Sequence, residues 1–381
     1  MYDVVVVGAG PCGTAAARRC AEMGLSTLCL EEHGTIGHPV QCAGLLSIAA
    51  WEGCRVGRKP ILHQVRGARI MASDGTGFSF DAGTTKAYVV DRGALDREMA
   101  GSAVTAGAEL QLKTYVRSIE DTTLRTVGMN GYREVSGRIF IAADGVRSGI
   151  ARMLGMGRSP VVLAGIQAEI VHDVNPDLVE VHPHASPDFF GWVIPIGKNR
   201  ARVGLCGGQQ VRERFTTFLQ HFGTACTDLV TGALPLGVMP RTYGRRTLFV
   251  GDAAGLVKPT SGGGIYTGVR SAMHAAEVAA ICCETGRFDD EALAEYECRW
   301  RADIGRELAL GFRLFQLRRT LTVKEVDIIL QTFQNPDMVA TILQWGDMDR
   351  PSKLVMQLIK KPEILRILHI LFRSGVRQIL K

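Results

Sequence analysis

The chain lacks an uninterrupted apolar run of about 20 residues, the length that a membrane-spanning helix requires. Its first residues lack the basic segment of a signal peptide. Among the ten cysteines there is no CxxC pair, and no Cys or His cluster has the spacing of a zinc site. Together these absences predict a cytoplasmic protein with reduced thiols and no metal site.

An excess of one sign of charge occurs only at the C-terminal end of the chain. Residues 352–381 hold seven of the 44 Lys and Arg but only Glu363 of the 38 Asp and Glu, so the rest of the chain is neutral. A neutral body argues against nucleic-acid binding, and a basic tail favours a local anionic surface.

The tail has the pattern of a basic amphipathic helix from Lys361 onward. Basic residues recur at spacings of three and four, at Arg366, His369, Arg373 and Arg377. Apolar residues fill the other face, at Ile364, Leu365, Leu368, Leu371, Phe372, Val376 and Ile379. Two interpretations remain open: the helix lies peripherally on the inner face of the cell membrane, or it docks on the protein's own core.

A nucleotide-binding fingerprint lies near the N-terminus. The sequence GAGPCG, residues 8–13, follows a predicted strand over 2–7 and opens an Ala-rich helix. Glycines in this setting let a pyrophosphate approach the helix N-terminus, and a carboxylate after the second strand accepts a hydrogen bond from a ribose hydroxyl. The second strand, over 26–30, ends at Glu31. The expected contacts are Gly8, Gly10, Cys12, Gly13 and Glu31, and the alternative is an ordinary βαβ turn.

A second glycine-rich stretch lies at residues 251–266. A predicted strand over 246–250 ends in Gly251-Asp252, and three glycines at 262–264 precede a predicted helix over 265–283. Amides at such a helix N-terminus favour a phosphate or the electron-rich edge of a reduced ring, and the aspartate can accept hydrogen bonds from sugar-type hydroxyls. Taken alone, the stretch is equally consistent with a loop between buried elements.

Two further segments complete a set of motifs. A predicted strand over 139–143 ends in Asp144-Gly145, and residues 91–96 read DRGALD. With GxGxxG, DG and GD in this order, the chain resembles the FAD-dependent oxidoreductases of the p-hydroxybenzoate hydroxylase and glutathione reductase superfamily. The resemblance implies FAD as cofactor, an arginine near the flavin, an aspartate on the ribityl chain and a helix start against the isoalloxazine. The residues implied are Arg92, Val116, Asp144, Asp252, Gly264 and Ile265.

Within that superfamily the chain is most similar to geranylgeranyl reductases, including archaeal enzymes that saturate digeranylgeranylglycerol lipids. Residues 36–44, 187–195 and 258–266 carry the likeness. It implies that Cys42 and Ala43 lie near the flavin and that Phe190, Trp192 and Pro195 line the substrate cavity. The family's PxxYxWxFP pattern has Phe190 in place of tyrosine and Ile194 in place of phenylalanine, which removes one possible polar contact or proton relay. Core packing is the alternative role of the aromatic residues.

The pattern predicts an α/β fold with a doubly wound, Rossmann-like FAD-binding domain. Alternating segments over 162–171, 178–182, 189–196 and 200–206 predict an inserted antiparallel β-sheet substrate domain. A helical C-terminal region completes the chain, whose 381 residues suffice for two domains. The expected boundaries are FAD-binding 1–60, 91–155 and 241–287, substrate 61–90 and 156–240, and C-terminal 288–381.

The predicted function is reduction of isolated C=C bonds of geranylgeranyl chains, on a lipid or a diphosphate. Reduced FAD would give hydride from N5, and an acid, either Cys42 or a bound water, would protonate the other carbon. Partners would be a prenyl lipid, an anionic membrane surface and a donor such as ferredoxin, NAD(P)H or another reduced carrier. The alternatives are an aromatic-type flavin monooxygenase and a flavin electron-transfer protein without a substrate of its own.

Overall fold

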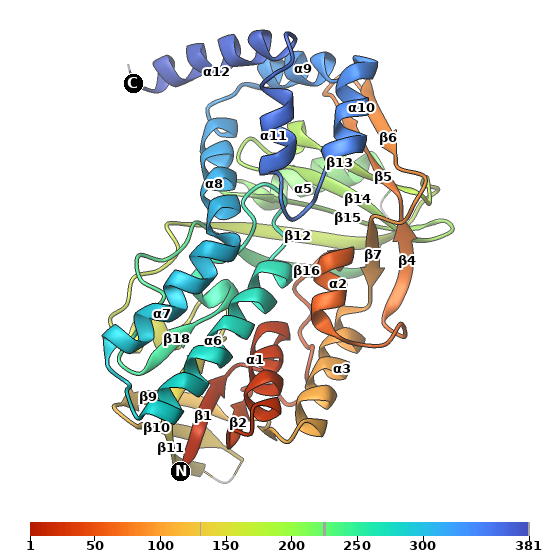
Figure 1. Cartoon of the computed structure of the whole chain (residues 1–381). Coiled ribbons are helices and arrows are strands. Elements are labelled where there is room, and N and C mark those ends of the chain that lie inside the picture. Colours follow the sequence, from red (N-terminus) through yellow and green to blue (C-terminus); the bar gives the residue numbers. More distant parts are fainter. Residues whose placement is uncertain (130, 224–225, 380–381) are drawn as a thin grey trace.

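The computed structural model describes residues 1–129, 131–223 and 226–379, and two sheets and a set of C-terminal helices succeed one another along its long axis (Figure 1). Side chains of residues 372 and 374–379 lie outside the described part, so Phe372, Val376, Arg377 and Ile379 of the predicted tail helix are not placed. The fold confirms the predicted α/β class, with a parallel sheet, an antiparallel sheet and C-terminal helices.

The first sheet contains the nucleotide-binding fingerprint. Its strand order is β17-β18-β11-β1-β2-β8, and all neighbours are parallel except β17 and β18. The strands are β1 (Tyr2–Val7), β2 (Thr27–Leu30), β8 (Glu109–Gln111), β11 (Gly131–Ala142), β17 (Tyr243–Gly244) and β18 (Thr247–Phe249). Because the strands are parallel, the loops after β1, β11 and β18 meet at one edge, where ligands bind in open α/β sheets.

An antiparallel extension lies at the other end of β11. The long β11 continues beyond the parallel sheet and pairs with β10 (Thr123–Gly128), which pairs with β9 (Tyr115–Glu120). The sequence patterns did not predict these two strands. Their short length and mixed burial give them no clear period-two alternation.

Helices cover the first sheet. They are α1 (Pro11–Glu22), α3 (Arg92–Thr105), α4 (Gly149–Met153), α6 (Ile265–Thr285) and α7 (Asp290–Trp300), and α2 (Ile48–Cys54) packs on α6. Pro11 stands at the first position of α1, where its missing N–H costs nothing. The Asp91 carboxylate caps α3 by accepting a hydrogen bond from the Ala94 amide at 2.9 Å. These local signals make the helix starts predictable from sequence.

The second sheet lies above the first, with the order β16-β12-β15-β14-β13-β5-β6. Its strands are β5 (Gly67–Met71), β6 (Gly77–Asp81), β12 (Val161–Val171), β13 (Leu178–His182), β14 (Gly191–Gly197), β15 (Arg200–Gly207) and β16 (Cys226–Leu236). The expected antiparallel sheet is confirmed, except that β13 and β5 are parallel. β5 comes from an earlier part of the chain, so no local pattern encodes its direction.

Smaller elements complete the middle of the molecule. A separate antiparallel sheet contains β3 (Leu45–Ser47), β7 (Ala87–Val90) and β4 (Ile61–Val65). Helix α5 (Val211–Gln220) packs on the second sheet through Phe215 and Phe218. Single turns are η1 (Pro183–Ala185), η2 (Gly251–Ala254) and the π-helical η3 (Arg301–Gly305).

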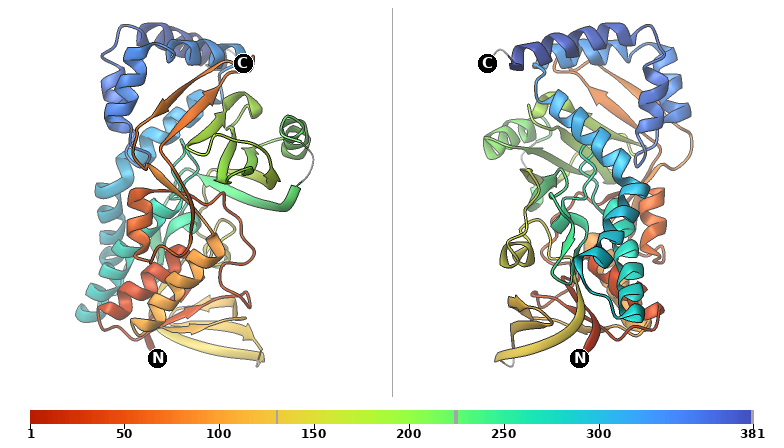
Figure 2. Two further views of the ribbon diagram at one scale, coloured as in Figure 1. Left: turned by 90° about the vertical axis from the view of Figure 1, so that its right-hand side faces the viewer. Right: turned by 60° about the vertical axis from the view of Figure 1, so that its left-hand side comes forward.

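The C-terminal helices lie at the far end from the first sheet (Figure 2). They are α9 (Val323–Thr332), α10 (Pro336–Trp345), α11 (Ser352–Leu358) and α12 (Ile364–Ile379), and α8 (Arg306–Arg318) leads up to them beside the second sheet. No helix in the described part of the chain is both long and apolar enough to cross a membrane.

Helix α12 docks on the protein with part of its predicted apolar face. Ile364 and Ile367 are buried in a cluster with Met338 and Leu358. Leu365 and Leu368, predicted on the same apolar face as Ile364, are instead 68% and 44% exposed. Docking on neighbouring helices selects the stripe that contains Ile364 and Ile367, and this turns the other two leucines toward solvent.

Candidate active site

One cavity of about 980 Å³ lies where the two sheets and the C-terminal helices meet. Its lower end is lined by the loops that follow β1, β11 and β18, and its middle by the faces of β12 and β14. The loop between α10 and α11, residues 346–350, contributes to its upper wall. The cavity therefore joins the carboxyl edge of the parallel sheet to the apolar face of the second sheet.

The loop after β1 can only be built with glycine at two positions. Gly8 has φ of +100°, and a Cβ on Gly13 would collide with the Gly8 carbonyl. Gly10 has open space around its Cα and lines the cavity. The backbone at the start of α1 is therefore exposed to the cavity, which is the arrangement that holds a pyrophosphate.

Cys12 lies where α1 crosses α6. A Cβ on Gly268 would collide with its sulfur, so the two helices pack closely through this pair. Burial, together with the nearby Asp252 carboxylate, raises the pKa of the Cys12 thiol well above its ordinary value. The thiol is therefore neutral, and it both packs the helices together and lines the cavity.

Glu31 lies beside the glycine loop, just outside the cavity lining. Its carboxylate accepts hydrogen bonds from the Ala9 amide at 2.8 Å and the His33 amide at 2.9 Å. The Thr114 amide donates to the Glu31 carbonyl, which brings the start of β9 and the buried Val116 to the same edge. The predicted ribose carboxylate and Val116 are thus placed at one end of the site, although neither lines the cavity.

The Asp144-Gly145 turn divides its roles between two residues. The Asp144 carboxylate accepts hydrogen bonds from the Ser148 hydroxyl at 2.7 Å and the Ile150 amide at 2.9 Å. Burial raises the pKa of this carboxyl, and the same hydrogen bonds partly oppose the rise. Asp144 therefore holds the turn, while Gly145, at φ +75°, faces the cavity.

Asp252 faces the cavity beside the glycine turn. A Cβ on Gly264 would lie 2.9 Å from the Asp252 Oδ1, so the carboxylate lies directly against the start of α6. Gly264 and Ile265 both line the cavity. Desolvation raises the pKa of Asp252 to about 6, and the Arg92 charge limits the rise. The structure thus holds a buried carboxylate that a hydroxyl-rich ligand would stabilise.

Arg92 supplies a fixed positive charge to the cavity. Its guanidinium makes two hydrogen bonds to the Asp96 carboxylate, at 3.1 Å and 3.0 Å. Burial lowers the pKa of Arg92, but Asp96 and Cys42 raise it by more, so the guanidinium stays charged. Arg92 and Cys42, which are 50 positions apart, are therefore neighbours in the cavity wall.

Cys42 and Ala43 lie in the loop that enters β3, and both line the cavity. The Cys42 sulfur accepts a hydrogen bond from the Gly44 amide at 3.3 Å. Sequence analysis missed Arg202, whose Nη1 donates to the Ala43 carbonyl at 2.9 Å and whose Nε donates to Glu169 at 3.0 Å. An arginine in the middle of an apolar strand was the available signal, since a buried charge needs partners.

An aromatic wall lines the cavity on the second sheet. Phe189 and Phe190 stack with ring centroids 4.3 Å apart, and Trp192 lies beside Phe190. The Trp192 indole N–H donates to the buried Gln167 side chain at 3.0 Å, a partner that sequence analysis also missed. The predicted Pro195 is buried in β14 opposite Ala201, and it is not among the residues that line the cavity.

A third missed group joins three segments at the cavity wall. The Lys258 ammonium lies 2.5 Å from the Asp349 Oδ1, and the Asp349 Oδ2 accepts a hydrogen bond from the Ser47 hydroxyl at 2.6 Å. All three residues line the cavity. Lys258 opens the segment 258–266 that carries part of the family likeness, but no motif signals the group, because its members lie in separate parts of the chain.

The residues at the lower end of the cavity fit a flavin dinucleotide. At the glycine-lined start of α1 and at the turn at Gly145, an added Cβ would enter open space of the cavity, and Gly264 at the start of α6 also lines it. The buried Asp252 lies among them and faces the cavity. In the described part of the chain, no group of three His, Cys, Asp or Glu side chains is arranged to hold a metal ion.

The chain is similar to known proteins over nearly its whole length. A family model described as lycopene cyclase protein matches residues 3–343. Digeranylgeranylglycerophospholipid reductase 2 of Methanothermobacter thermautotrophicus is 33% identical, over 96% of this chain and 98% of its own. The protein of the same name from Methanopyrus kandleri is 32% identical, over 96% and 98%.

Solved structures show the same fold. A geranylgeranyl bacteriochlorophyll reductase-like protein from Thermoplasma acidophilum matches with a TM-score of 0.83 and 25% identity, over 94% of this chain and 98% of that one. The flavin-dependent brominase Bmp2 matches with a TM-score of 0.71 and 17% identity, over 94% and 98%, which shows the fold alone. The chain belongs to the geranylgeranyl reductase family, within a fold shared with flavin-dependent enzymes.

Proposed function

We propose that the chain is an FAD-dependent reductase that saturates isolated C=C bonds of geranylgeranyl chains. The observation that supports this most is the continuity of the cavity: its glycine-lined end suits a flavin, and its other end is apolar and aromatic. The names of the relatives, digeranylgeranylglycerophospholipid reductases, indicate a prenyl lipid as the substrate class.

The apolar end suits a prenyl chain because it offers few polar groups. Its wall includes Ile166, Val179, Ile194 and Leu234 next to the aromatic residues. An isolated C=C bond has no adjacent carbonyl that a protein can polarise. The prenyl chain must therefore be held close to the hydride donor and away from water. As the prenyl chain slides along this apolar wall, its successive double bonds would reach the same position beside the hydride donor.

The junction between the two ends supplies the charges and the proton. Bound FAD, once reduced, would supply the hydride. The amides at the start of α6 carry roughly half a positive charge and would favour negative charge on a ligand there. Cys42 can donate its Sγ proton to a carbon of the substrate, and Arg92 beside it supplies a fixed cation.

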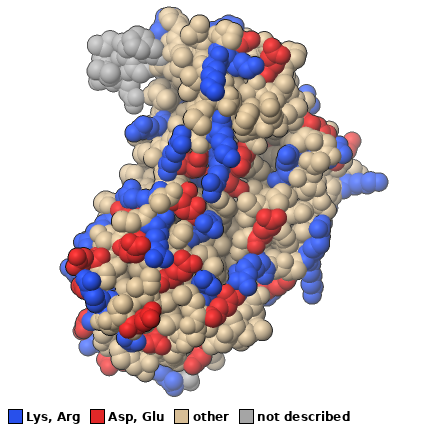
Figure 3. Space-filling view, in the orientation of Figure 1, with Lys and Arg blue, Asp and Glu red and all other residues tan. Residues whose placement is uncertain are grey.

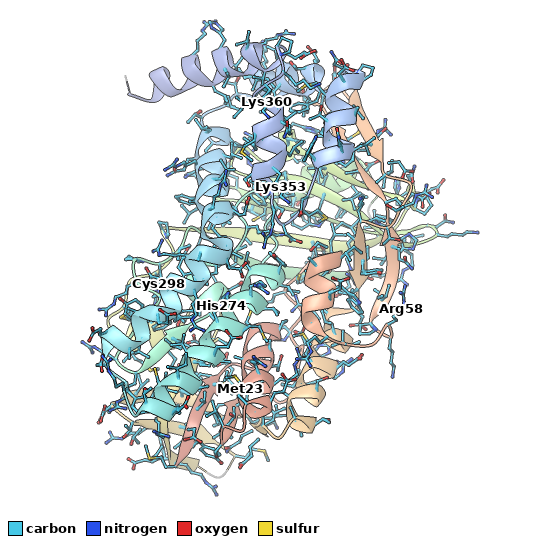
Figure 4. All side chains as sticks on the ribbon, in the orientation of Figure 1. Met23, Arg58, His274, Cys298, Lys353 and Lys360 are labelled. Carbon is cyan, nitrogen blue, oxygen red and sulfur yellow. The ribbon has the colours of Figure 1, made fainter. Side chains whose placement is uncertain are left out.

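The C-terminal helices present a surface suited to an anionic membrane. Leu365 and Leu368 of α12 are exposed, as are Met356 and Ile359 of the α11 region. Lys353 lies in α11 and Lys360 in the turn that follows it (Figure 4), and acidic side chains are scarce in this part of the chain. Over the lower part of the molecule, positive and negative side chains are mixed (Figure 3). Each basic residue near an anionic bilayer contributes about 1 kcal/mol.

This surface is close to the cavity in the structure. Ile342, Leu343 and Leu354, from α10 and α11, line the cavity, and Leu343 is also partly exposed to solvent. A lipid could therefore pass from the bilayer to the cavity between these helices. The protein would act at the inner face of the cell membrane without crossing it.

The test is an anaerobic single-turnover experiment. The purified flavoprotein is reduced chemically, mixed with a digeranylgeranylglycerol phospholipid, and followed by flavin absorbance and by lipid mass. Stepwise gains of two hydrogens with matching flavin reoxidation would support the proposal. An unchanged lipid mass, as in a cyclisation, or reoxidation only when air is admitted would overturn it. Ferredoxin and NAD(P)H are then compared as donors in multiple turnover.

The membrane part has its own test. Replacing Leu365 and Leu368 with glutamate should abolish cosedimentation with anionic phospholipid vesicles while leaving flavin content unchanged. The exposed Tyr132, changed to glutamate, is the matched control because it lies at the opposite end of the molecule, near β10. Equal vesicle binding by wild type and the double variant would contradict this membrane surface.

A further inference from the structure

A buried lysine lies across the glycine turn at the start of α6. The Lys258 side chain is 9% exposed, and its amide and carbonyl both bond within the turn, to Gly263 and Gly262. A Cβ on Gly263 would lie 2.9 Å from the Lys258 Cε and 3.2 Å from its Nζ. The ammonium therefore lies directly against the backbone of the turn that the family resemblance assigns to the flavin ring.

The counter-ion of this lysine comes from a distant loop. Asp349 lies between α10 and α11, and its carboxylate side chain is 5% exposed. One carboxylate oxygen lies 2.5 Å from the Lys258 ammonium, which also donates to the Met348 carbonyl at 3.0 Å. The other oxygen accepts from the Ser47 hydroxyl, which also caps α2 by accepting from the Ala50 amide.

The loop that carries Asp349 is held in place at several points. The Asp347 carboxylate accepts hydrogen bonds from the Asp349 amide at 2.7 Å and the Arg350 amide at 3.1 Å. Next along the chain, the Ser352 amide donates to the Glu307 carboxylate of α8 at 3.0 Å. The position of the Asp349 carboxylate is thus set by the fold and is not a chance surface contact.

Packing alone does not explain a buried ion pair. Removing two charges from water is costly, and an apolar pair of similar volume is often as stable or more stable. Here both charges line the cavity, and the ammonium lies beside the glycine turn at the start of α6. A cation beside the turn would stabilise negative charge on a ligand, and an adjacent anion would oppose that effect.

We propose that Lys258 is a positioning residue that sets the electrostatic potential at the ring end of the cofactor site, and that the negative charge of Asp349 partly offsets it. The inference rests on the proposed flavin binding. The Lys258 charge favours the reduced, negatively charged cofactor, and Asp349 limits this preference. Asp349 lies in the loop between α10 and α11, which lines the cavity. The C-terminal region therefore contributes to setting the midpoint potential of the cofactor.

The test is the two-electron midpoint potential of the holoenzyme, measured by equilibration with a reference dye. Lys258→Met should lower the ratio of reduced-flavin to oxidised-flavin affinity about tenfold, which corresponds to about 30 mV for a two-electron couple. Asp349→Asn should shift the potential the opposite way. Lys258→Arg keeps the charge and should stay near wild type, and the exposed Lys198→Met in the β14–β15 turn should show no shift.

The direction of the two shifts decides the result. A merely structural pair would loosen the site in the same way when either partner is lost, so shifts of the same sign, or no shift, would overturn the inference. If one single variant does not fold, the double variant Lys258→Met/Asp349→Asn is compared with the other single variant, and their difference gives the missing shift. Failure of the wild-type protein to bind any flavin would instead overturn the proposed function.

Discussion

The two ends of the cavity differ in what lines them, backbone at one end and side chains at the other. The lower end is made of backbone, at loops where Gly8, Gly145 and Gly251 adopt positive φ and where a Cβ on Gly13 has no room. The upper end is made of side chains on or next to sheet strands, such as Trp192 in β14 and Phe190 just before it. A glycine whose backbone must adopt positive φ or approach a ligand closely cannot be replaced by another residue. Residues of an apolar wall can be exchanged for other apolar residues as long as the total side-chain volume is kept.

That difference matches the way the chain departs from its family pattern. Every glycine of the GxGxxG fingerprint is present, but the aromatic pattern has Phe190 for tyrosine and Ile194 for phenylalanine. Ile194 is buried in β14 and also lines the cavity, so the substitution changes the shape of the wall without adding a polar group. The comparison predicts that substitutions at the lower end will affect cofactor binding and those at the upper end will affect lipid binding.

The largest expected effect is at the glycine loop, where two substitutions separate folding from binding. Gly13→Ala places a methyl group on the Gly8 carbonyl. We therefore expect the protein to unfold, or its affinity for flavin to fall more than a hundredfold. Gly10→Ala has room for its methyl, so the flavin-free protein should keep its Tm while flavin binding is lost. Thermal melts and flavin titration measure both. Normal flavin affinity in Gly10→Ala would refute the placement of the cofactor.

The next effect is expected at Cys42, where the two ends meet. Cys42→Ala should lower the rate of flavin reoxidation by lipid about a hundredfold or more, because a general acid typically contributes that much. Flavin affinity should change little. The exposed Cys298→Ala (Figure 4) is the matched control. An unchanged reoxidation rate would assign the proton to another donor, such as a bound water.

A smaller effect is expected at the aromatic wall. Phe190→Ala removes one ring of the stacked pair and enlarges the cavity, so KM for the lipid should rise about tenfold, within the range that apolar contacts supply. Flavin affinity should stay within a factor of two. Phe190→Tyr, which restores the family's residue, should keep the KM of wild type. Loss of flavin in Phe190→Ala would contradict the separation of the two ends.

The smallest effect is a pH-dependent change in stability at Asp252. The folded-state pKa of about 6 lies above the ordinary value of 3.8, so the folded protein binds this proton more tightly than the unfolded chain does. Stability of the flavin-free protein therefore falls as pH rises from about 4 through 6. Asp252→Asn should remove this fall, with a Tm gain near zero at pH 4 and of a few degrees above pH 7, while flavin binding weakens. A Tm difference independent of pH would contradict the raised pKa.

The sequence alone determined the local units of the site. The strand, glycine turn and helix start at residues 2–13 and at 247–265 follow from neighbouring residues, because turn geometry and helix capping act over a few positions. The antiparallel strands over 161–207 follow from their alternation, which reports burial of one face. The FAD motifs and the family likeness also came from short segments, among them residues 36–44, 91–96 and 144–145.

Only the tertiary structure decided which segments meet. Asp349 reaches Lys258 across 91 positions, Arg202 reaches the Ala43 carbonyl, and β5 joins β13 in parallel. Helix α12 was predicted as an amphipathic helix, but its docking exposes Leu365, which the pattern placed on the apolar face, and buries Ile367, which the pattern left out. The physical reason is the same in each case: a sequence pattern reports local structure, but which residues are buried, and against which partner, is set by the packing of the whole chain.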